Sequence, residues 1–265
     1  MRIRIVFGLT NKGASVPFHH QFLLSNLVNS ILDKYKGDFQ HFDLFNFSGL
    51  KGQTKVGKEG LHFYSNKVTL VFSSPNDDFI DFFIKCLFKQ QQVEIGKLLL
   101  IPLNVEKEVN PQLINEAKYI CISPLVVISP TDFSVDAKKF ISPGVDAFSD
   151  MLYESTMNRM EKSGRFSAEE ISSFYKFQII PDKNYLTKIR EEEKKFARIF
   201  PAFDKSNKYE VRGYTLPFTL YADEKVQQFV FDCGLGVFTH KGFGMLDLAN
   251  ADPNQRTTPY LVQQD

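Results

Sequence analysis

The stretch Gly234-Leu-Gly-Val-Phe-Thr-His-Lys-Gly-Phe-Gly-Met-Leu-Asp-Leu248 places four glycines around one short polar segment, Thr239-His240-Lys241. A helical pattern precedes it, because apolar residues at i, i+3, i+4 and i+7 end at Cys233. After the polar segment, residues 243–248 are typical of a short strand. The predicted order is therefore helix, glycine-rich loop, strand. Glycines in such a loop let backbone N–H groups approach an anionic ligand without a Cβ clash.

The two common glycine-rich phosphate loops do not match this stretch. They run in the order strand, loop, helix, which is the reverse of the order predicted here. The dinucleotide pattern Gly-x-Gly-x-x-Gly needs a glycine where Thr239 stands, and the Walker pattern needs Gly-Lys-Ser/Thr, whereas Lys241 precedes Gly242. A mononucleotide or dinucleotide site is therefore disfavoured. The alternative that stays open is a connection with glycines at its turns.

The stretch resembles the C-terminal glycine-rich loop of the CRISPR-associated endoribonucleases that mature precursor guide RNA, the sixth numbered family of those proteins. In that family the loop follows a helix and reads Gly-hydrophobic-Gly, a polar spacer, and Gly-hydrophobic-Gly-hydrophobic. Gly234-Leu235-Gly236 and Gly242-Phe243-Gly244-Met245 fit this pattern, with Val237–Lys241 as the spacer. Other segments that look like family positions extend the resemblance over nearly the full length: residues 16–21, 44–48 and 122–125.

Composition indicates a packed protein in a reducing environment. The 265 residues are 43% hydrophobic, enough for a core in one large domain or two smaller ones. Each of Cys86, Cys121 and Cys233 sits in an apolar stretch, which favours buried thiols over disulfides. No apolar run reaches the roughly 18 residues of a membrane span, and the alternating residues 1–7 favour a strand over a signal peptide. We therefore expect a cytoplasmic protein with no membrane partner.

The net charge of +1 is small for a nucleic-acid-binding protein, so an RNA ligand would need the positive charge gathered on one face. One candidate patch is the glycine-containing loop with Lys51, Lys55 and Lys58. Another lies at residues 188–198, where Glu191-Glu192-Glu193 dilutes the basic side chains. For this second patch a solvated helix face is the alternative interpretation.

Hydrophobic periodicity divides the first half of the chain into alternating strands and helices. The order is β-α-β-β-α-β, which is that of the ferredoxin-like fold. A polar segment at residues 104–116, which contains Pro111, is the predicted linker. The predicted elements are a strand at residues 3–7, a helix at 23–32, a hairpin at 61–73 that turns at Ser65-Asn66, a helix at 79–87, and a strand or strand pair at 93–105.

The second half repeats this order less cleanly. Residues 174–180 and 185–194 are predicted to be inserted between the helix and the hairpin, and the tail after Asp252 is predicted to fray. The predicted elements are a strand at residues 119–129, a helix at 145–162, a hairpin of residues 195–203 and 208–221, the helix that ends at Cys233, and the last strand at 243–248. The prediction is therefore an α+β protein of two tandem ferredoxin-like, RRM-like domains, residues 1–113 and 114–265, with the glycine-rich loop in the second. The resemblance implies the same architecture.

The resemblance also implies RNA cleavage without a metal ion or other cofactor. The 2′-hydroxyl beside the scissile phosphate attacks it and leaves a 2′,3′-cyclic phosphate and a 5′-hydroxyl. Histidine suits the proton transfers and lysine the phosphorane charge. The family's catalytic histidine follows the first helix, a position matched here by His41, and Lys51 lies in the loop beyond. Some members carry a catalytic tyrosine in that helix, where this chain has Asn29, and Tyr35 is the substitute that we propose.

The remaining histidines carry weaker predictions. His20 and its neighbour His19, at the start of the first helix, are weaker catalytic candidates, and the alternative is that they cap or pack there. His62, within a strand, is expected to be structural. His-x-x-x-His, His-Glu-x-x-His and Cys-x-x-Cys are absent from the sequence, so a metal site is not expected. The set expected to contact RNA is Gly234, Gly236, His240, Lys241, Gly242 and Gly244, with Arg159, Lys162 and Arg165 as further contacts.

These observations predict an endoribonuclease that cuts CRISPR repeat RNA within precursor transcripts to give mature guide RNA. It would act as a monomer or homodimer. One alternative is a non-catalytic subunit that holds guide RNA in a CRISPR effector complex, which the loss of the helix tyrosine favours. A more distant alternative is a ferredoxin-like protein whose glycine loop binds a small phosphorylated ligand.

Overall fold

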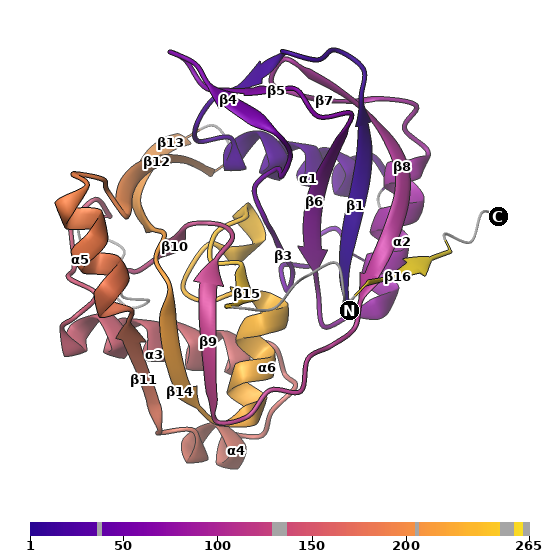
Figure 1. Ribbon diagram of the computed structural model, residues 1–265. Helices are drawn as coiled ribbons and strands as arrows, with labels where there is room; N and C mark the ends of the chain where they lie inside the picture. Colours follow the sequence, from indigo (N-terminus) through magenta and orange to yellow (C-terminus); the bar gives the residue numbers. More distant parts are fainter. Residues whose placement is uncertain (36–38, 129–136, 205–206, 250–256, 262–265) are drawn as a thin grey trace. The chain divides into compact units, whose positions relative to one another are not determined.

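The computed structural model is a mixed α+β structure with several antiparallel sheets (Figure 1), and it describes residues 1–35, 39–128, 137–204, 207–249 and 257–261. The chain divides into two compact units. The first, unit 1, contains Met1–Asn110, His240–Gly242 and the described part of the C-terminal tail. The second, unit 2, contains Pro111–Thr239 and the segment that begins at Phe243.

The main sheet of unit 1 has the strand order β16-β8-β1-β6-β3. Strand β7 pairs with the part of β8 that β16 does not cover, and every pairing is antiparallel. Two helices, α1 after β1 and α2 after β6, lie together on one face of this sheet (Figure 1). The elements are β1 (Arg2–Leu9), α1 (Gln21–Tyr35), β3 (Asn46–Phe47), β6 (Lys67–Ser73), α2 (Asp77–Phe88), β7 (Val93–Ile95), β8 (Leu98–Glu108) and β16 (Thr257–Tyr260).

Local signals explain these helices and strands. Alternate residues of β1, namely Ile3, Ile5 and Phe7, are fully buried in the core of unit 1. The side chain of Asn76 caps α2 by accepting the N–H of Phe79 at 3.0 Å, and the first turn of α2 is acidic, which suits the helix dipole. The helix then buries one apolar face against the sheet, so unit 1 has one continuous core.

A second, small sheet in unit 1 has the order β2-β5-β4 and contains β2 (Ser15–Val16), β4 (Thr54–Val56) and β5 (Leu61–Phe63). The predicted hairpin that turns at Ser65-Asn66 is therefore wrong. The strand before this turn, β5, pairs with β2 and β4, whereas the strand after it, β6, pairs with β1 and β3. β5 pairs with β2, which is distant in the sequence, because this pairing lets Phe63 pack into the core from the small sheet.

Unit 2 contains a four-stranded antiparallel sheet in the order β11-β14-β9-β15 and a three-stranded sheet in the order β10-β13-β12. Helix α3 follows β9 and β10, and helix α6 connects β14 to the glycine-rich loop. The elements are β9 (Glu116–Cys121), β10 (Leu125–Val126), α3 (Asp146–Lys162), α4 (Ala168–Ser173), β11 (Phe177–Pro181), α5 (Lys183–Glu191), β12 (Ala197–Asp204), β13 (Asn207–Tyr214), β14 (Phe218–Ala222), α6 (Glu224–Cys233), η1 (Thr239–Lys241) and β15 (Leu246–Leu248).

Three predictions for the second half need correction. Residues 208–221 form two strands in different sheets, β13 and β14, rather than one. Residues 177–181, predicted to be part of an insertion, form the edge strand β11 of the four-stranded sheet. Residues 257–260, predicted to fray, form β16 and pair with β8 of unit 1. Each error has the same cause, since pairing across the fold outweighs local composition.

Within the described ranges, which omit residues 36–38, 129–136, 205–206, 250–256 and 262–265, the helices are all too short or too polar to cross a bilayer.

Candidate functional site

The glycine-rich loop is built on four glycines in the left-handed region of backbone space. Gly234, Gly236, Gly242 and Gly244 have φ angles of +79°, +83°, +82° and +75°. A Cβ at Gly244 would lie 1.9 Å from the carbonyl oxygen of Leu235, and one at Gly236 would lie 2.4 Å from that of Val126. Both the backbone conformation and the close packing therefore require glycine.

Much of the loop's backbone is hydrogen-bonded inside unit 2. The N–H of Leu235 donates to the carbonyl of Gly244 at 2.9 Å, and the N–H of Gly244 donates to Pro124 at 2.7 Å. The N–H of Val237 donates to Val126 at 3.2 Å. These three donors are engaged within the protein, so they differ from the outward-facing N–H groups that the sequence predicts for this loop.

Arg159 on α3 holds the start of the loop from the carbonyl side. Its guanidinium donates to the carbonyl oxygens of Cys233 at 2.6 Å, Gly234 at 2.8 Å and Gly236 at 3.3 Å. The same guanidinium lies 5.3 Å from the ring centroid of Phe229 on α6. Arg159 therefore organises the end of α6 and the loop, a structural role that the sequence did not indicate.

The middle of the loop belongs to unit 1. Residues 239–241 form the short 3-10 helix η1, and the side chains of His240 and Lys241 are half-buried. At Gly242 a Cβ would lie 2.2 Å from the ring of Phe47, so the backbone of the loop passes directly over a residue of β3. This strand also connects the segment of His41 to Lys51. The loop is thus brought close to the part of unit 1 that carries the predicted catalytic residues.

His41 is exposed on a turn that two phenylalanines hold in place. The rings of Phe39 and Phe42 lie 5.4 Å and 4.6 Å from the ring of Phe79 on α2, and Phe39 also lies 5.4 Å from Phe82. The N–H of Phe42 donates to the carbonyl of Phe39 at 3.1 Å, which closes the turn. The backbone at His41 is therefore fixed while its side chain faces solvent.

Tyr35 lies before the His41 turn, at the end of α1, and Lys51 lies after it, beyond β3. Tyr35 is half-buried at the end of α1, and the ammonium groups of Lys34 and Lys89 lie 5.4 Å and 5.8 Å from its ring centroid. Lys51 exchanges two backbone hydrogen bonds with Thr69 of β6. Thr69 and Ser73, the partner of Asn46, are four positions apart on β6, which is about 13 Å along the sheet edge. Strand β3 thus separates the His41 turn from Lys51.

Two other histidines are bound to the backbone. The buried His20 has Nδ1 3.2 Å from the carbonyl of Pro17, and its Nε2 accepts the N–H of Leu50 at 3.1 Å. This pattern fixes the neutral tautomer with the proton on Nδ1, and burial lowers the pKa of His20. Nδ1 of His62 lies 2.8 Å from the carbonyl of Gly13. Both residues pack and hold loops, as the sequence suggests.

The three cysteines are free thiols, of which Cys86 and Cys233 are buried and Cys121 is partly exposed. Burial raises the pKa of Cys121 and of Cys233 to about 12, so neither is a ready thiolate. Across the described segments of the chain, His, Cys, Asp and Glu side chains form no group of three or more able to hold a metal ion.

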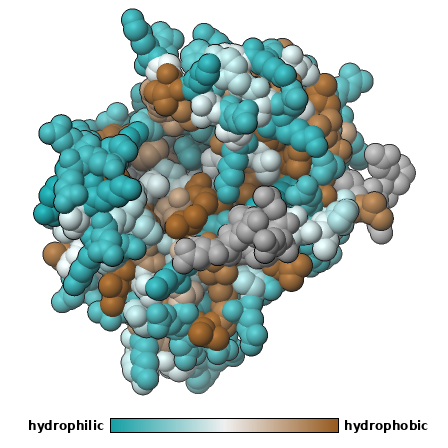
Figure 2. Space-filling view, viewed as in Figure 1, coloured by the Kyte–Doolittle hydropathy of each residue, from teal (hydrophilic) through white to brown (hydrophobic). Residues whose placement is uncertain are grey.

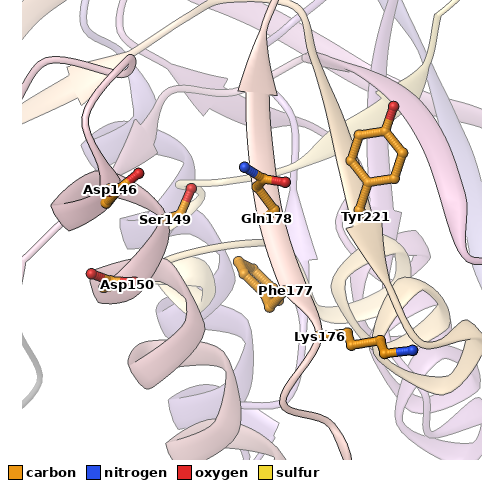
Figure 3. Close-up of a pocket in the computed structure, with 7 residues that line it drawn as sticks. All are labelled: Asp146, Ser149, Asp150, Lys176, Phe177, Gln178 and Tyr221. Atoms are coloured by element: carbon orange, nitrogen blue, oxygen red, sulfur yellow. The ribbon is translucent and has the colours of Figure 1, made fainter.

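Unit 2 also has an open pocket of about 400 Å³ between the first turn of α3 and the edge strand β11 (Figure 3). None of the residues predicted for catalysis or RNA binding lines it, and no motif in the sequence indicates it. The hydroxyl of Ser149, which lines the pocket, accepts the N–H of Ile179 at 3.1 Å. The lining residues are Asp146, Ser149, Asp150, Lys176, Phe177, Gln178 and Tyr221.

Comparison with known proteins agrees with this picture. Residues 106–248, more than half of the chain, match the model of the family "CRISPR associated protein Cas6, C-terminal". A protein of Methanocaldococcus jannaschii named CRISPR-associated endoribonuclease Cas6 1 is 25% identical over 97% of this chain and 95% of its own length.

Two solved structures share the fold. One, described as "CRISPR associated protein Cas6", has a TM-score of 0.74 at 21% identity and covers 94% of this chain and 99% of its own. Another, described as "An RAMP protein binding different RNA substrates", also has a TM-score of 0.74, at 20% identity, and covers 94% of this chain and 100% of its own. With a family model that matches more than half of its residues, the chain belongs to the Cas6 family of CRISPR-associated proteins.

Proposed function

We propose that this protein is a metal-independent endoribonuclease that cleaves CRISPR repeat RNA within precursor transcripts and so produces mature guide RNA. The observation that carries the proposal is the similarity, over 97% of the chain, to a protein named as a CRISPR-associated endoribonuclease. Family membership through residues 106–248 supports it independently.

The fold that we propose for this activity is a tandem pair of ferredoxin-like domains, residues 1–113 and 114–265. In unit 1 the order β8-β1-β6-β3 arranges the strands of a β-α-β-β-α-β chain as 4-1-3-2. In unit 2 the order β11-β14-β9-β15 reads as 2-3-1-4, which is the same arrangement from the other edge. The β12–β13 hairpin and α5 are then additions to the second domain.

His41 is the general acid or base in the proposed reaction. A base takes the proton of the 2′-hydroxyl, whose oxygen bonds to phosphorus, and an acid gives a proton to the departing 5′-oxygen. The exposed side chain of His41 on a fixed turn supports this role, because the rings of His20 and His62 are tied to backbone groups. Lys51 is proposed to stabilise the phosphorane charge, and Tyr35 is the candidate for the second proton-transfer group.

The glycine-rich loop has a divided role in the proposal. His240 and Lys241, in the 3-10 turn, contact an RNA phosphate, and Gly242 lets the loop lie against Phe47 of β3. The other three glycines contribute by shaping the backbone on which this turn stands. RNA bound to the loop would then lie beside β3, the strand that separates His41 from Lys51.

The second candidate function is a non-catalytic subunit that holds guide RNA in a CRISPR effector complex. Two points favour it. The resemblance places Asn29 where some members carry a catalytic tyrosine, and about 13 Å of sheet edge lie between Asn46, just beyond the His41 turn, and Lys51. Both candidates require RNA binding, so cleavage decides between them.

The test is cleavage of a labelled CRISPR repeat RNA in EDTA by the wild type, His41→Ala and Gln40→Ala. Gln40 is the exposed neighbour of His41 in the same turn and serves as the matched control. We expect one cut per repeat by the wild type and Gln40→Ala, none by His41→Ala, and none in RNA with a 2′-deoxy nucleotide at the cut. Tight binding by the wild type without any cut would establish the holding subunit instead.

A further inference from the structure

The small sheet of unit 1 carries a local surplus of positive charge. It and its connecting loops occupy residues 10–16 and 51–67, a region with five lysines and a single carboxylate, although the whole chain has a net charge of only +1. Figure 2 shows hydrophilic side chains projecting where the outer end of β4 lies in Figure 1. The charged residues are Lys12, Lys51, Lys55, Lys58, Glu59 and Lys67.

Four of these lysines are exposed, and none of the acidic side chains in the described ranges forms an ion pair with them: Lys12, Lys55, Lys58 and Lys67. The other basic segment of the sequence differs. At α5, the carboxylate of Glu192 lies 4.0 Å from the ammonium of Lys188 and 2.7 Å from that of Lys194. Of the two basic segments, the small sheet therefore has the greater uncompensated charge.

An exposed aromatic ring lies among these lysines. Tyr64, directly after β5, is 44% exposed, and the ammonium of Lys55 lies 5.0 Å from its ring centroid. A Cβ at Gly13 would lie 3.7 Å from this ring, so the loop that carries Lys12 runs along its edge. Lys55 and His62 are opposite one another in the β4–β5 register. Tyr64 lies two residues after His62, so its ring is on the same outer face as the ammonium of Lys55.

The sheet beneath this ring is held firmly. Phe63 and Val16 point to the inner face and are buried in the core of unit 1. The loop before β2 is fixed to β5 through the N–H of Gly13, which donates to the carbonyl of Phe63 at 2.6 Å, and through Nδ1 of His62. The outer face is therefore a preorganised surface on which the ring of Tyr64 lies beside the ammonium of Lys55 and the loop that carries Lys12.

We propose that the outer face of the β2-β5-β4 sheet is a binding surface for single-stranded RNA, separate from the glycine-rich loop. An unpaired base stacks on Tyr64, and the surrounding lysines bind the phosphates on either side. Exposed aromatic rings among basic side chains are how proteins bind single strands with little sequence preference, since every base has a stackable face. An acidic protein surface would use the lysines but has no need of the central ring. This inference rests on the proposed function, because it assigns a place to unpaired RNA next to the repeat.

The experiment compares the full-length wild type with Tyr64→Ala, Tyr64→Phe and the pair Lys55→Gln/Lys58→Gln. The control pair, Lys176→Gln/Lys183→Gln, removes the same charge from exposed positions of unit 2. Binding of a labelled 15-nucleotide oligouridylate is measured between 50 and 300 mM KCl, alongside cleavage of the repeat RNA. Thermal unfolding shows that each variant is folded.

We expect Tyr64→Ala to weaken oligouridylate binding by about tenfold and Tyr64→Phe to restore it, because stacking needs the ring alone. The Lys55/Lys58 pair should reduce the slope of log Kd against log salt by about 1.4, and the control pair should leave it unchanged. Unchanged affinity in Tyr64→Ala and the Lys55/Lys58 pair, in an enzyme that still cuts the repeat, would overturn the surface while sparing the proposed function. A wild type that binds no RNA would overturn both.

Discussion

At the scale of single residues, His20 shows how a histidine can resemble a catalytic group in sequence and serve the fold instead. Its ring joins the turn before α1 to the segment after β3 through two backbone hydrogen bonds. Removal would leave the buried N–H of Leu50 without this partner and would also free the part-buried carbonyl of Pro17.

We expect His20→Ala to lower the free energy of unfolding by about 1–3 kcal/mol, the cost of unsatisfied buried polar groups. Urea denaturation measures it, and His19→Ala, a change in the half-exposed neighbour, should cost less. Equal losses in the two variants would contradict the structural role of His20.

The same residue predicts a pH dependence. Burial lowers the pKa of His20 in the folded state, so a proton is bound more readily by the unfolded chain. The stability that comes from the neutral ring is complete above the unfolded pKa of about 6.5 and is lost as the pH falls through the folded value. The difference in unfolding free energy between the wild type and His20→Ala should therefore shrink from pH 7.5 to pH 5. A difference that stays constant would show that the ring is not held neutral.

Gly244 of the loop and Gly164, which follows α3, offer a matched pair of substitutions. Gly164 and Gly244 both have positive φ, +64° and +75°, but a Cβ at Gly164 would meet nothing within 4 Å, whereas one at Gly244 would meet the carbonyl of Leu235 at 1.9 Å. We expect Gly164→Ala to cost about 1–2 kcal/mol from backbone strain alone. Gly244→Ala should cost at least about 3 kcal/mol, because the loop must also move. Thermal unfolding of both variants measures the difference, and equal losses would show that the loop absorbs the clash.

At the scale of elements, Arg159 connects α3 to the end of α6. It bonds three carbonyl oxygens that no helical N–H satisfies, since helices end with unpaired carbonyls. We expect Arg159→Met to lower stability by about 3 kcal/mol, in line with hydrogen bonds from a charged donor. Arg159→Lys should recover only part of this, because an ammonium lacks the planar fork.

Arg165→Met, an exposed arginine beyond the same helix, is the control for the Arg159 variants. Its unfolding temperature should stay close to that of the wild type. If Arg159→Met weakens RNA binding more than its loss of stability explains, then RNA affinity depends on the loop conformation that Arg159 holds. An unfolding temperature unchanged in Arg159→Met would contradict the bracing role.

Elements with strong local signals can be predicted from the sequence here. The apolar spacing of α2 and its Asn76 cap lie within one short segment, and so do the apolar spacing of α6 and its Asp223 cap. The partners of β5 cannot be predicted in this way, because β2 lies far earlier in the chain and the choice depends on where Phe63 is buried. Strand order is a property of the assembled core rather than of any segment.

The same limit applies to the candidate site. The sequence identifies the glycine loop and singles out His41 by its position after the first helix. It does not reveal that Gly244 packs against the carbonyl of Leu235 while Gly242 packs against Phe47. Leu235 lies across the loop from Gly244, and Phe47 is distant in the chain. Nor does the sequence reveal that Arg159 faces the loop's carbonyls. These roles depend on backbone approach, which residue type and spacing do not encode.

At the scale of the whole molecule, the chain returns to unit 1 at its end. Residues 257–260 pair with 105–108 of β8, and the hydroxyl of Tyr260 donates to the carboxylate of Asp81 on α2. The covered part of β8 includes Glu108, which is buried between Arg2 and Arg4 at 2.8 Å from each. A strand from outside the first 110 residues therefore covers part of the edge of β8.

Truncation after Leu248 tests this arrangement. Removing β16 exposes the edge of β8 and lets water reach the Glu108 cluster, so we expect unit 1 to unfold at a lower temperature and the protein to aggregate more readily. Tyr260→Phe, which removes only the bond to Asp81, should cost about 1 kcal/mol and cause no aggregation. Calorimetry with light scattering on the three proteins distinguishes the contributions. A truncated chain that unfolds like the wild type would show that β16 covers the edge without stabilising it, and that unit 1 is complete at residue 110.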